Sequence, residues 1–265
     1  MNNNLRDGKT LKSFLAEKNK SIRKKQITEL DTYIHTRKGK DKNVIRFVKY
    51  WGLSSKKFID KYDLDAIIFL FGFLRSVEKK YKMDVHLTLV FTDTHAILNG
   101  YNPDIYNSYI KDIRHAMNCF NYSHVLMSEV LMPYIKQHNL NDLNGLIGFI
   151  VNESKQRQIP EYLSGRISFN RLTDSASKYS ERYLNKNEFD DFGFDSSEQS
   201  AYAYILLNQT EKTYIEKVFF QSVFLTYTSD EEKEFIIPEL PNLQIYSYRS
   251  GMRGRPWFST LNKQL

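Results

Sequence analysis

Apolar residues follow two kinds of pattern along the chain, one typical of β-strands and one typical of α-helices. The alternation of these patterns predicts an α/β fold. Residues 43–52 and 85–91 are short runs rich in β-branched and aromatic side chains, which is typical of strands that are buried on both faces. Between them, residues 64–80 repeat apolar side chains every three or four positions, as a helix does, and Asp60 or Asp63 can cap its start. Strand, helix, strand is the unit from which parallel sheets are built.

The same two patterns continue toward the end of the chain. Pro133 interrupts the pattern, residues 134–196 are mostly helical, and polar loops are expected at 153–160 and 185–196. The other elements that the patterns predict are helices at 105–120 and 197–219 and strands at 123–127, 222–227 and 243–248. We therefore predict a doubly wound, five-stranded parallel sheet of Rossmann type with right-handed crossovers.

Polar residues follow the strand at 85–91 immediately. Thr92, Asp93, Thr94 and His95 are consecutive, and an Asn-Gly turn at 99–100 comes shortly after them. Open α/β sheets bind ligands outside the carboxyl ends of their strands. We therefore expect Asp93 and His95 to line a binding site. The same pattern also fits a structural role in which His95 caps the next helix.

A second group of polar residues lies on the predicted helix at 197–219. Tyr204 and Glu211 are seven residues apart, so at 100° per residue they point within about 20° of each other, with Asn208 on the same stripe. A phenol, an amide and a carboxylate on one helix face make a surface that can bind an ammonium group. An ordinary solvent-facing helix surface would have the same composition.

The positive charge is concentrated at the beginning of the sequence. Residues 1–49 hold 14 lysines and arginines against 5 acidic residues, so this segment carries +9 while the remainder sums to −2. We predict a basic helical extension at 1–42 and a catalytic domain at 43–265. Such an extension binds a polyanion such as RNA, or is simply a solvated helix. The cations that we expect to bind RNA here are Lys20, Arg23, Lys24 and Lys25.

Several classes of protein are excluded or disfavoured by what the sequence contains. The single cysteine, Cys119, excludes an internal disulfide framework and a multi-cysteine zinc site, and the six histidines show no metal-ligand spacing. Neither the glycine pattern of dinucleotide-binding folds nor a phosphate-binding loop occurs, so we expect no cofactor. The longest apolar run, 66–74, is too short to span a bilayer, and no secretory signal is visible, so we expect a cytoplasmic protein.

The stretch VHLTLVFTDTHAILNGY at 85–101 resembles the second-strand signature of tyrosyl- and tryptophanyl-tRNA synthetases. In those class I enzymes an apolar strand ends in an acid, another residue and His-Ala, and Asp93, His95 and Ala96 stand in these places. Their amino acid is read from one helix by Tyr, Gln four residues later and Asp three residues after that. Tyr204, with Asn208 and Glu211, has the same spacing. The resemblance spans roughly 44–258 and implies an amino-acid substrate, with a basic or hydroxylated side chain if Glu211 reads it.

The ATP-binding elements of that family are missing. No His-x-Gly-His follows the first strand, where the chain reads YWGLSSKKFIDKYD, and SYRSGMRGRPWF replaces the lysine-rich loop after the last strand. Arg249, Arg253 and Arg255 in that segment could hold a phosphate instead. Adenylation of a free amino acid therefore has little support in the sequence.

The chain also resembles the tRNA-dependent cyclodipeptide synthases, which share the synthetase fold and do not use ATP. Their nucleophilic serine stands in a Gly-x-Ser turn after the first strand, where this chain has Gly52-Leu53-Ser54. Their substrate amine is held by a Tyr and an acid on a long helix, similar to Tyr204 and Glu211, and another Tyr near the fourth strand is similar to Tyr227. The Asn that usually follows the nucleophile is absent here. Ser54 also fits an ordinary turn or helix-capping serine.

These resemblances imply an aminoacyltransferase that uses charged tRNA, holds the acyl group on Ser54 and forms an amide bond, with a cyclic dipeptide as one such product. Two alternatives stay open. One is an ATP-dependent amino-acid activating enzyme related to tyrosyl-tRNA synthetase, and the other is a tRNA-binding synthetase paralogue without catalysis. The expected partners are aminoacyl-tRNA and an amino acid, with no membrane, and the sequence makes no prediction of the oligomeric state.

Overall fold

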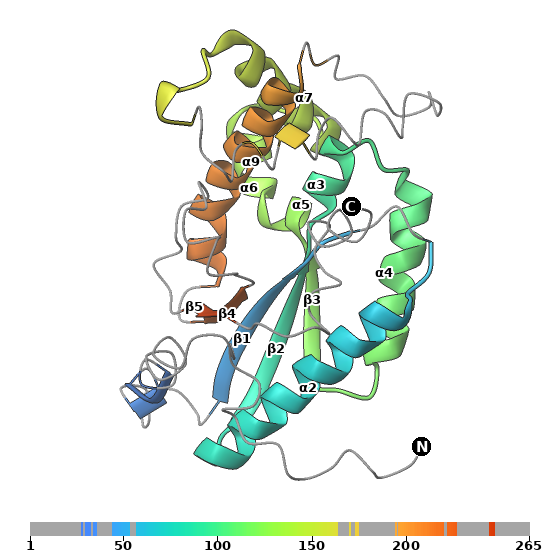
Figure 1. Cartoon of the computed structure of the whole chain (residues 1–265), viewed down its shortest axis with the longest axis vertical. Helices are drawn as coiled ribbons and strands as arrows, with labels where there is room; N and C mark the ends of the chain where they lie inside the picture. The colour runs from blue at the N-terminus through green and yellow to red at the C-terminus, as the bar shows by residue number, and fades with distance from the viewer. Residues whose placement is uncertain are drawn as a thin grey trace.

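The computed structural model shows a parallel sheet flanked by helices (Figure 1). It describes residues 28, 30–32, 34–35, 44–53, 57–163, 170, 173–174, 194, 196–219, 222–226 and 244–246.

The described strands form one parallel sheet in the order β3-β2-β1-β4-β5. Their bounds are β1 Val44–Trp51, β2 Asp84–Phe91, β3 Tyr122–Leu126, β4 Val223–Thr226 and β5 Gln244–Tyr246. The predicted α/β class is thus confirmed, with β3, β2 and β1 as its continuous three-stranded core. The last two strands cover part of their predicted ranges, and the residues beside them lie outside the described ones.

The sheet reverses its direction of growth between β1 and β4. The chain adds β2 and β3 on one side of β1, and then β4 and β5 on the other. β1 and β2 pair from Val44 with Asp84 to Trp51 with Phe91, so both strands end at the same level. A reversal of this kind leaves a crevice outside the carboxyl ends of the strands, where α/β proteins bind ligands.

The predicted helices at 64–80, 105–120 and 197–219 are present, and the structure adds short helices at 93–98 and 127–130. Their bounds are α2 Lys61–Tyr81, α3 Asp93–Leu98, α4 Pro103–Met117, α5 Met127–Val130, α6 Met132–Gln137, α7 Leu143–Gln156, the short 3₁₀ helix η2 Glu161–Leu163, and α9 Ser197–Val218. Helix α4 starts two residues earlier than predicted, because the Asn102 side chain caps it by accepting from the Asp104 N–H and proline suits the first helical position.

One predicted loop is partly wrong. We expected a loop from residue 153, but α7 continues to Gln156, and Arg157 just beyond it pairs with Glu153 one turn earlier. Pro133 does divide the chain as predicted, since α5 ends at Val130 and α6 carries the proline in its first turn.

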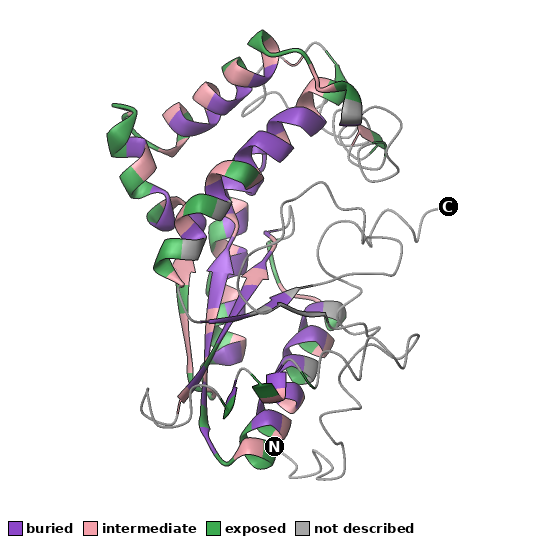
Figure 2. Ribbon diagram, turned by 90° about the vertical axis from the view of Figure 1, so that its left-hand side faces the viewer, coloured by how far each residue is buried: buried purple, intermediate pink, exposed green. Residues whose placement is uncertain are grey.

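Two apolar clusters cover the two faces of the sheet. Phe47, Leu87 and Leu89 belong to one cluster together with residues of α2 and α4. Val48 and Val90, on the opposite face because side chains alternate along a strand, pack with residues of α7 and α9. Figure 2 shows the buried strands between these helices, and Figure 1 shows α3, α5, α7 and α9 gathered where β2 and β3 end.

A buried hydrogen-bond network fixes the chain just after β1. The Tyr109 hydroxyl of α4 donates to Asp63 of α2 over 2.6 Å and accepts from the Trp51 indole at the end of β1 over 3.1 Å. One turn further along α4, Asp112 accepts from the backbone N–H of Ile59 over 2.9 Å. These contacts tie the ends of the segment that contains Gly52 and the predicted nucleophile to α4.

Lys49 is the most unusual residue of the sheet, because it is only 1% exposed and faces the same side as Phe47 and Trp51. Its ammonium Nζ donates to the carbonyl of Leu225 on β4 over 3.2 Å, so it lies where the strand order reverses. Burial lowers its pKa well below the usual value for lysine.

The network around Tyr109 yields a stability prediction. We expect Tyr109→Phe to lower the free energy of unfolding by about 2–3 kcal/mol, since it deprives a buried carboxylate of one donor and the Trp51 indole of its acceptor. Urea unfolding measures the change. Tyr122→Phe is the control, because among the described residues that hydroxyl bonds to the Arg114 carbonyl at the surface, and the change should stay within about 0.5 kcal/mol. Equal effects of the two substitutions would contradict the network.

Lys49 yields a prediction that depends on pH. Its folded pKa is lowered, so between that pKa and about 10.4 the unfolded chain binds more protons and stability rises with pH. Lys49→Met should therefore raise the free energy of unfolding by about 1–3 kcal/mol below the folded pKa, with a gain that shrinks toward pH 10. Urea unfolding between pH 6 and 10 measures this, and a difference that grows with pH would refute the assignment.

Candidate functional site at the carboxyl end of the sheet

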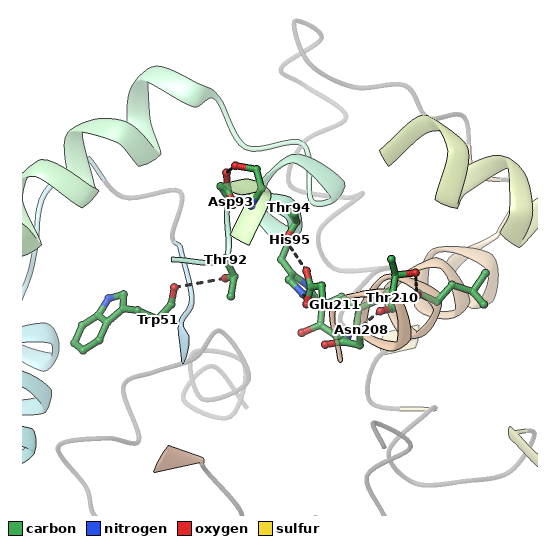
Figure 3. Close-up of polar contacts among 11 residues, drawn as sticks. Trp51, Thr92, Asp93, Thr94, His95, Asn208, Thr210 and Glu211 are labelled. Atoms are coloured by element: carbon green, nitrogen blue, oxygen red, sulfur yellow. Dashed lines mark hydrogen bonds and ion pairs between the residues drawn. The ribbon is translucent and has the colours of Figure 1, made fainter. Parts of the chain in front are cut away.

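The candidate site begins where β1 and β2 end side by side. The Thr92 N–H donates to the Trp51 carbonyl over 3.2 Å, and the Thr92 hydroxyl lies 3.5 Å from the same oxygen (Figure 3). This contact extends the pairing of the two strands by one residue. It places the half-buried Gly52 beside the start of α3, whose first three residues are Asp93, Thr94 and His95.

Asp93 is buried, and its carboxylate accepts hydrogen bonds from Ser128 at the start of α5. The Ser128 N–H donates to one carboxylate oxygen over 3.0 Å, and the Ser128 hydroxyl donates to the other. Burial raises the pKa of Asp93 above its ordinary value, although the bonds from Ser128 act in the opposite direction. The Asp93 carboxylate therefore joins the end of β2 to the chain after β3.

Glu211 of α9 is the centre of the site, and it is only 4% exposed. The Thr94 hydroxyl donates to Oε1 over 2.6 Å, and Nε2 of His95 lies 2.9 Å from Oε2 (Figure 3). Each carboxylate oxygen thus has a donor from α3, which satisfies a charge that would otherwise be very costly to bury.

His95 is buried between Glu211 and Tyr204. Its ring centroid lies 4.5 Å from that of Tyr204, with the planes tilted by 59°. Its other nitrogen, Nδ1, is buried and has no hydrogen-bond partner in the described part of the chain. One nitrogen of the imidazole is therefore bonded to Glu211, and the other has no bond to any described residue.

The three residues of the predicted stripe on α9 do not all have partners in the same place. Tyr204 and Glu211 reach the residues that follow β2, as the 20° offset predicts. Asn208 is half-buried and donates from its side-chain amide to the carbonyl of Tyr204, one turn earlier in the same helix, over 2.8 Å. The amide nitrogen of Asn208 is thus used within α9.

The other predicted site residues lie outside the described ones and stay predictions. They are the nucleophile Ser54, Tyr227, and the cations Lys20, Arg23, Lys24, Lys25, Arg249, Arg253 and Arg255.

A basic hollow of about 1000 Å³ opens beside α4, rather than between His95 and Tyr204. Its walls come from α4, β3 and the segment after β1. The residues that line it are Lys57, Phe58, Ser108, Lys111, Asp112, Arg114, His115, Asn118, Phe120, Tyr122 and His124. Burial, followed by the charge of Arg114, lowers the pKa of His124. Three permanent cations and one carboxylate make this hollow fit an anionic ligand.

Several of these residues were not predicted, although the sequence around some of them carries a signal. Lys111 and Arg114 are three residues apart on one predicted helix, which places them on the same face. Lys49 stands two positions from both Phe47 and Trp51, so strand alternation indicates that it points into the core. For Ser128 nothing in the local pattern indicates a bond to Asp93, which is 35 residues away.

The described residues show neither a metal-binding cluster nor a membrane-spanning helix. Among them, no three or more His, Cys, Asp or Glu side chains cluster closely enough to hold a metal ion. None of the helices in that part of the chain combines the length and apolar character that crossing a membrane requires.

No protein-family model and no curated protein matches this sequence. Among solved structures, the chain is similar to the PvcA protein from Pseudomonas aeruginosa, with 11% identity and a TM-score of 0.53 over 86% of this chain and 73% of PvcA. It is also similar to a cyclodipeptide synthase from Candidatus Glomeribacter gigasporarum, solved with bound Phe-tRNAPhe, with 11% identity and a TM-score of 0.46 over 83% of this chain and 93% of that one. The match to PvcA shows that the two proteins share a fold.

Proposed function

We propose that this chain is an aminoacyltransferase with a class I synthetase-like, Rossmann-type fold. It takes an aminoacyl group from charged tRNA and forms an amide bond, with a cyclic dipeptide as the expected product. One observation supports this most directly. The two motifs that resemble the synthetases and cyclodipeptide synthases, more than 100 residues apart in sequence, meet through the bonds of Glu211 to Thr94 and His95.

The proposed roles follow the residues of that site. Ser54 accepts the acyl group, and Gly52 precedes it at the end of β1. Tyr204 and Asn208 orient the amino acid beside Asp93 and His95, and Tyr227 positions the second amine. The aminoacyl ester is already an activated acyl donor, so the transfer needs no ATP.

The basic hollow beside α4 supports tRNA as the donor. Lys57, Lys111 and Arg114 present permanent positive charges around an open concave surface, and phosphate contacts dominate the affinity of most nucleic-acid complexes. The segment that contributes Lys57 follows Gly52 directly. The hollow and the nucleophile are therefore linked by a few residues of chain.

The product test compares cells that express the natural chain with cells that express Ser54→Ala. We expect mass spectrometry to detect a cyclic dipeptide with the natural chain and none with Ser54→Ala, since the variant has no oxygen to hold the acyl group. Amino-acid-dependent pyrophosphate exchange by the purified protein would instead identify an ATP-dependent activating enzyme. Binding of tRNA that survives Ser54→Ala, with no product from either protein, would identify a binding paralogue.

The tRNA test replaces two cations of the hollow together, with Lys111→Gln and Arg114→Gln. Each lost phosphate contact should weaken binding roughly fivefold to tenfold at 0.1 M salt and lower the log–log salt slope by about 1. Lys79→Gln with Lys136→Gln removes the same charge from exposed sites outside the hollow and is the control. Filter binding of bulk charged tRNA measures both pairs, and equal slopes would place the tRNA elsewhere.

A further inference from the structure

The carboxylate of Glu211 determines which nitrogen of the His95 imidazole donates a hydrogen bond. An ionised carboxylate only accepts hydrogen bonds, so Nε2 must carry a hydrogen toward Oε2 of Glu211, 2.9 Å away. The Thr94 hydroxyl holds Oε1 over 2.6 Å, which keeps the carboxylate from turning away. In the neutral ring the remaining nitrogen, Nδ1, then has a free lone pair.

The buried Nδ1 atom of His95 is the unusual feature of this site. His95 is only 6% exposed, and Nδ1 has no partner among the described residues. A buried acceptor without a hydrogen bond is destabilising, and such groups are uncommon in native structures. This acceptor lies in the first turn after β2, at the edge of the sheet where α/β proteins bind ligands.

We propose that His95 is the catalytic base of this protein and that its Nδ1 takes the proton of the attacking substrate amine. Glu211 is a positioning residue, which fixes the ring through Nε2 and stabilises the imidazolium that forms. This inference rests on the proposed function, because it assigns the proton transfer of the same acyl-transfer reaction.

The step balances without any other reactant. The amine nitrogen forms a bond to the ester carbonyl carbon, and its proton moves to Nδ1 of His95. The bond between that carbon and the ester oxygen then breaks, and the departing oxygen takes the proton from Nδ1. An amide and a free hydroxyl group result, and His95 and Glu211 return to their starting states. A carboxylate that orients an imidazole while its other nitrogen moves protons is a recurrent catalytic arrangement.

Tyr204 is the aromatic neighbour of the proposed base. It is half-buried, and its ring centroid lies 4.5 Å from that of the imidazole. Nδ1 itself is buried, so the proposal requires a neighbouring side chain to move before a substrate amine can reach it.

The decisive variant is His95→Gln. Its side-chain amide reaches the place of Nε2 and can still donate to Glu211, but it has no atom at Nδ1. In single-turnover acyl transfer from charged tRNA we expect the rate to fall about 100-fold to 10,000-fold, with the KM for charged tRNA unchanged. His86→Gln is the matched control and should keep full activity, since His86 bonds to Ser123 on the sheet, outside the site.

A second measurement does not depend on turnover. In the ¹⁵N NMR spectrum of the full-length protein at neutral pH, we expect Nε2 of His95 to be protonated and Nδ1 to be unprotonated. Glu211→Gln should remove this fixed pattern and lower kcat more than it changes KM, as a positioning residue requires.

The outcomes separate this inference from the proposed function. If the natural chain and His95→Gln transfer the acyl group at equal rates, His95 is not the base, and the proposed function still stands. A protonated Nδ1 in the spectrum also overturns the role of His95. Absence of transfer by the natural chain, with any charged tRNA, overturns both ideas together. Loss of transfer in His95→Gln, with a folded protein and an unprotonated Nδ1 in the natural chain, supports the proposal.

Discussion

The buried carboxylate of Glu211 is the contact on which the site depends. It comes from α9, and both of its oxygens accept from residues that follow β2. Without these donors a charge at this depth would be strongly destabilising. The same bonds therefore make the burial of Glu211 tolerable, fix α9 against the end of the sheet and orient His95. This one interaction therefore affects the position of α9, the stability of the fold and the chemistry of the site.

Charged groups are buried repeatedly near the ends of the strands. Asp63 anchors α4 through Tyr109, Asp93 is held by Ser128, and Lys49 reaches across to the backbone of β4. Burying an ionisable group lowers stability unless neighbouring groups compensate, so natural cores rarely retain several. All three lie near the carboxyl end of β1 or β2, and buried ionisable groups with specific partners are typical of functional sites.

The basic hollow and the carboxyl-edge site are separate features that share one connecting segment. The chain leaves β1 at Trp51, and a few residues later Lys57 lines the hollow. Asp112 holds the segment at Ile59 while Tyr109 holds its other end through Trp51. A polyanion bound beside α4 would thus contact the same stretch of chain that carries the proposed nucleophile.

The sequence by itself determined the elements and the faces that they present. Strand alternation, helical repeats and capping residues are local, so they located β1, β2, α2 and α9 to within a few residues. The seven-residue spacing of Tyr204 and Glu211 likewise put them on one helix face before any fold was known. The tertiary structure decided the partners. Strand order and contacts between residues far apart in sequence bring Glu211 to Thr94 and His95. They also decide that Asn208 bonds to its own helix and that Lys49 is enclosed between β1 and β4. No local pattern encodes these contacts.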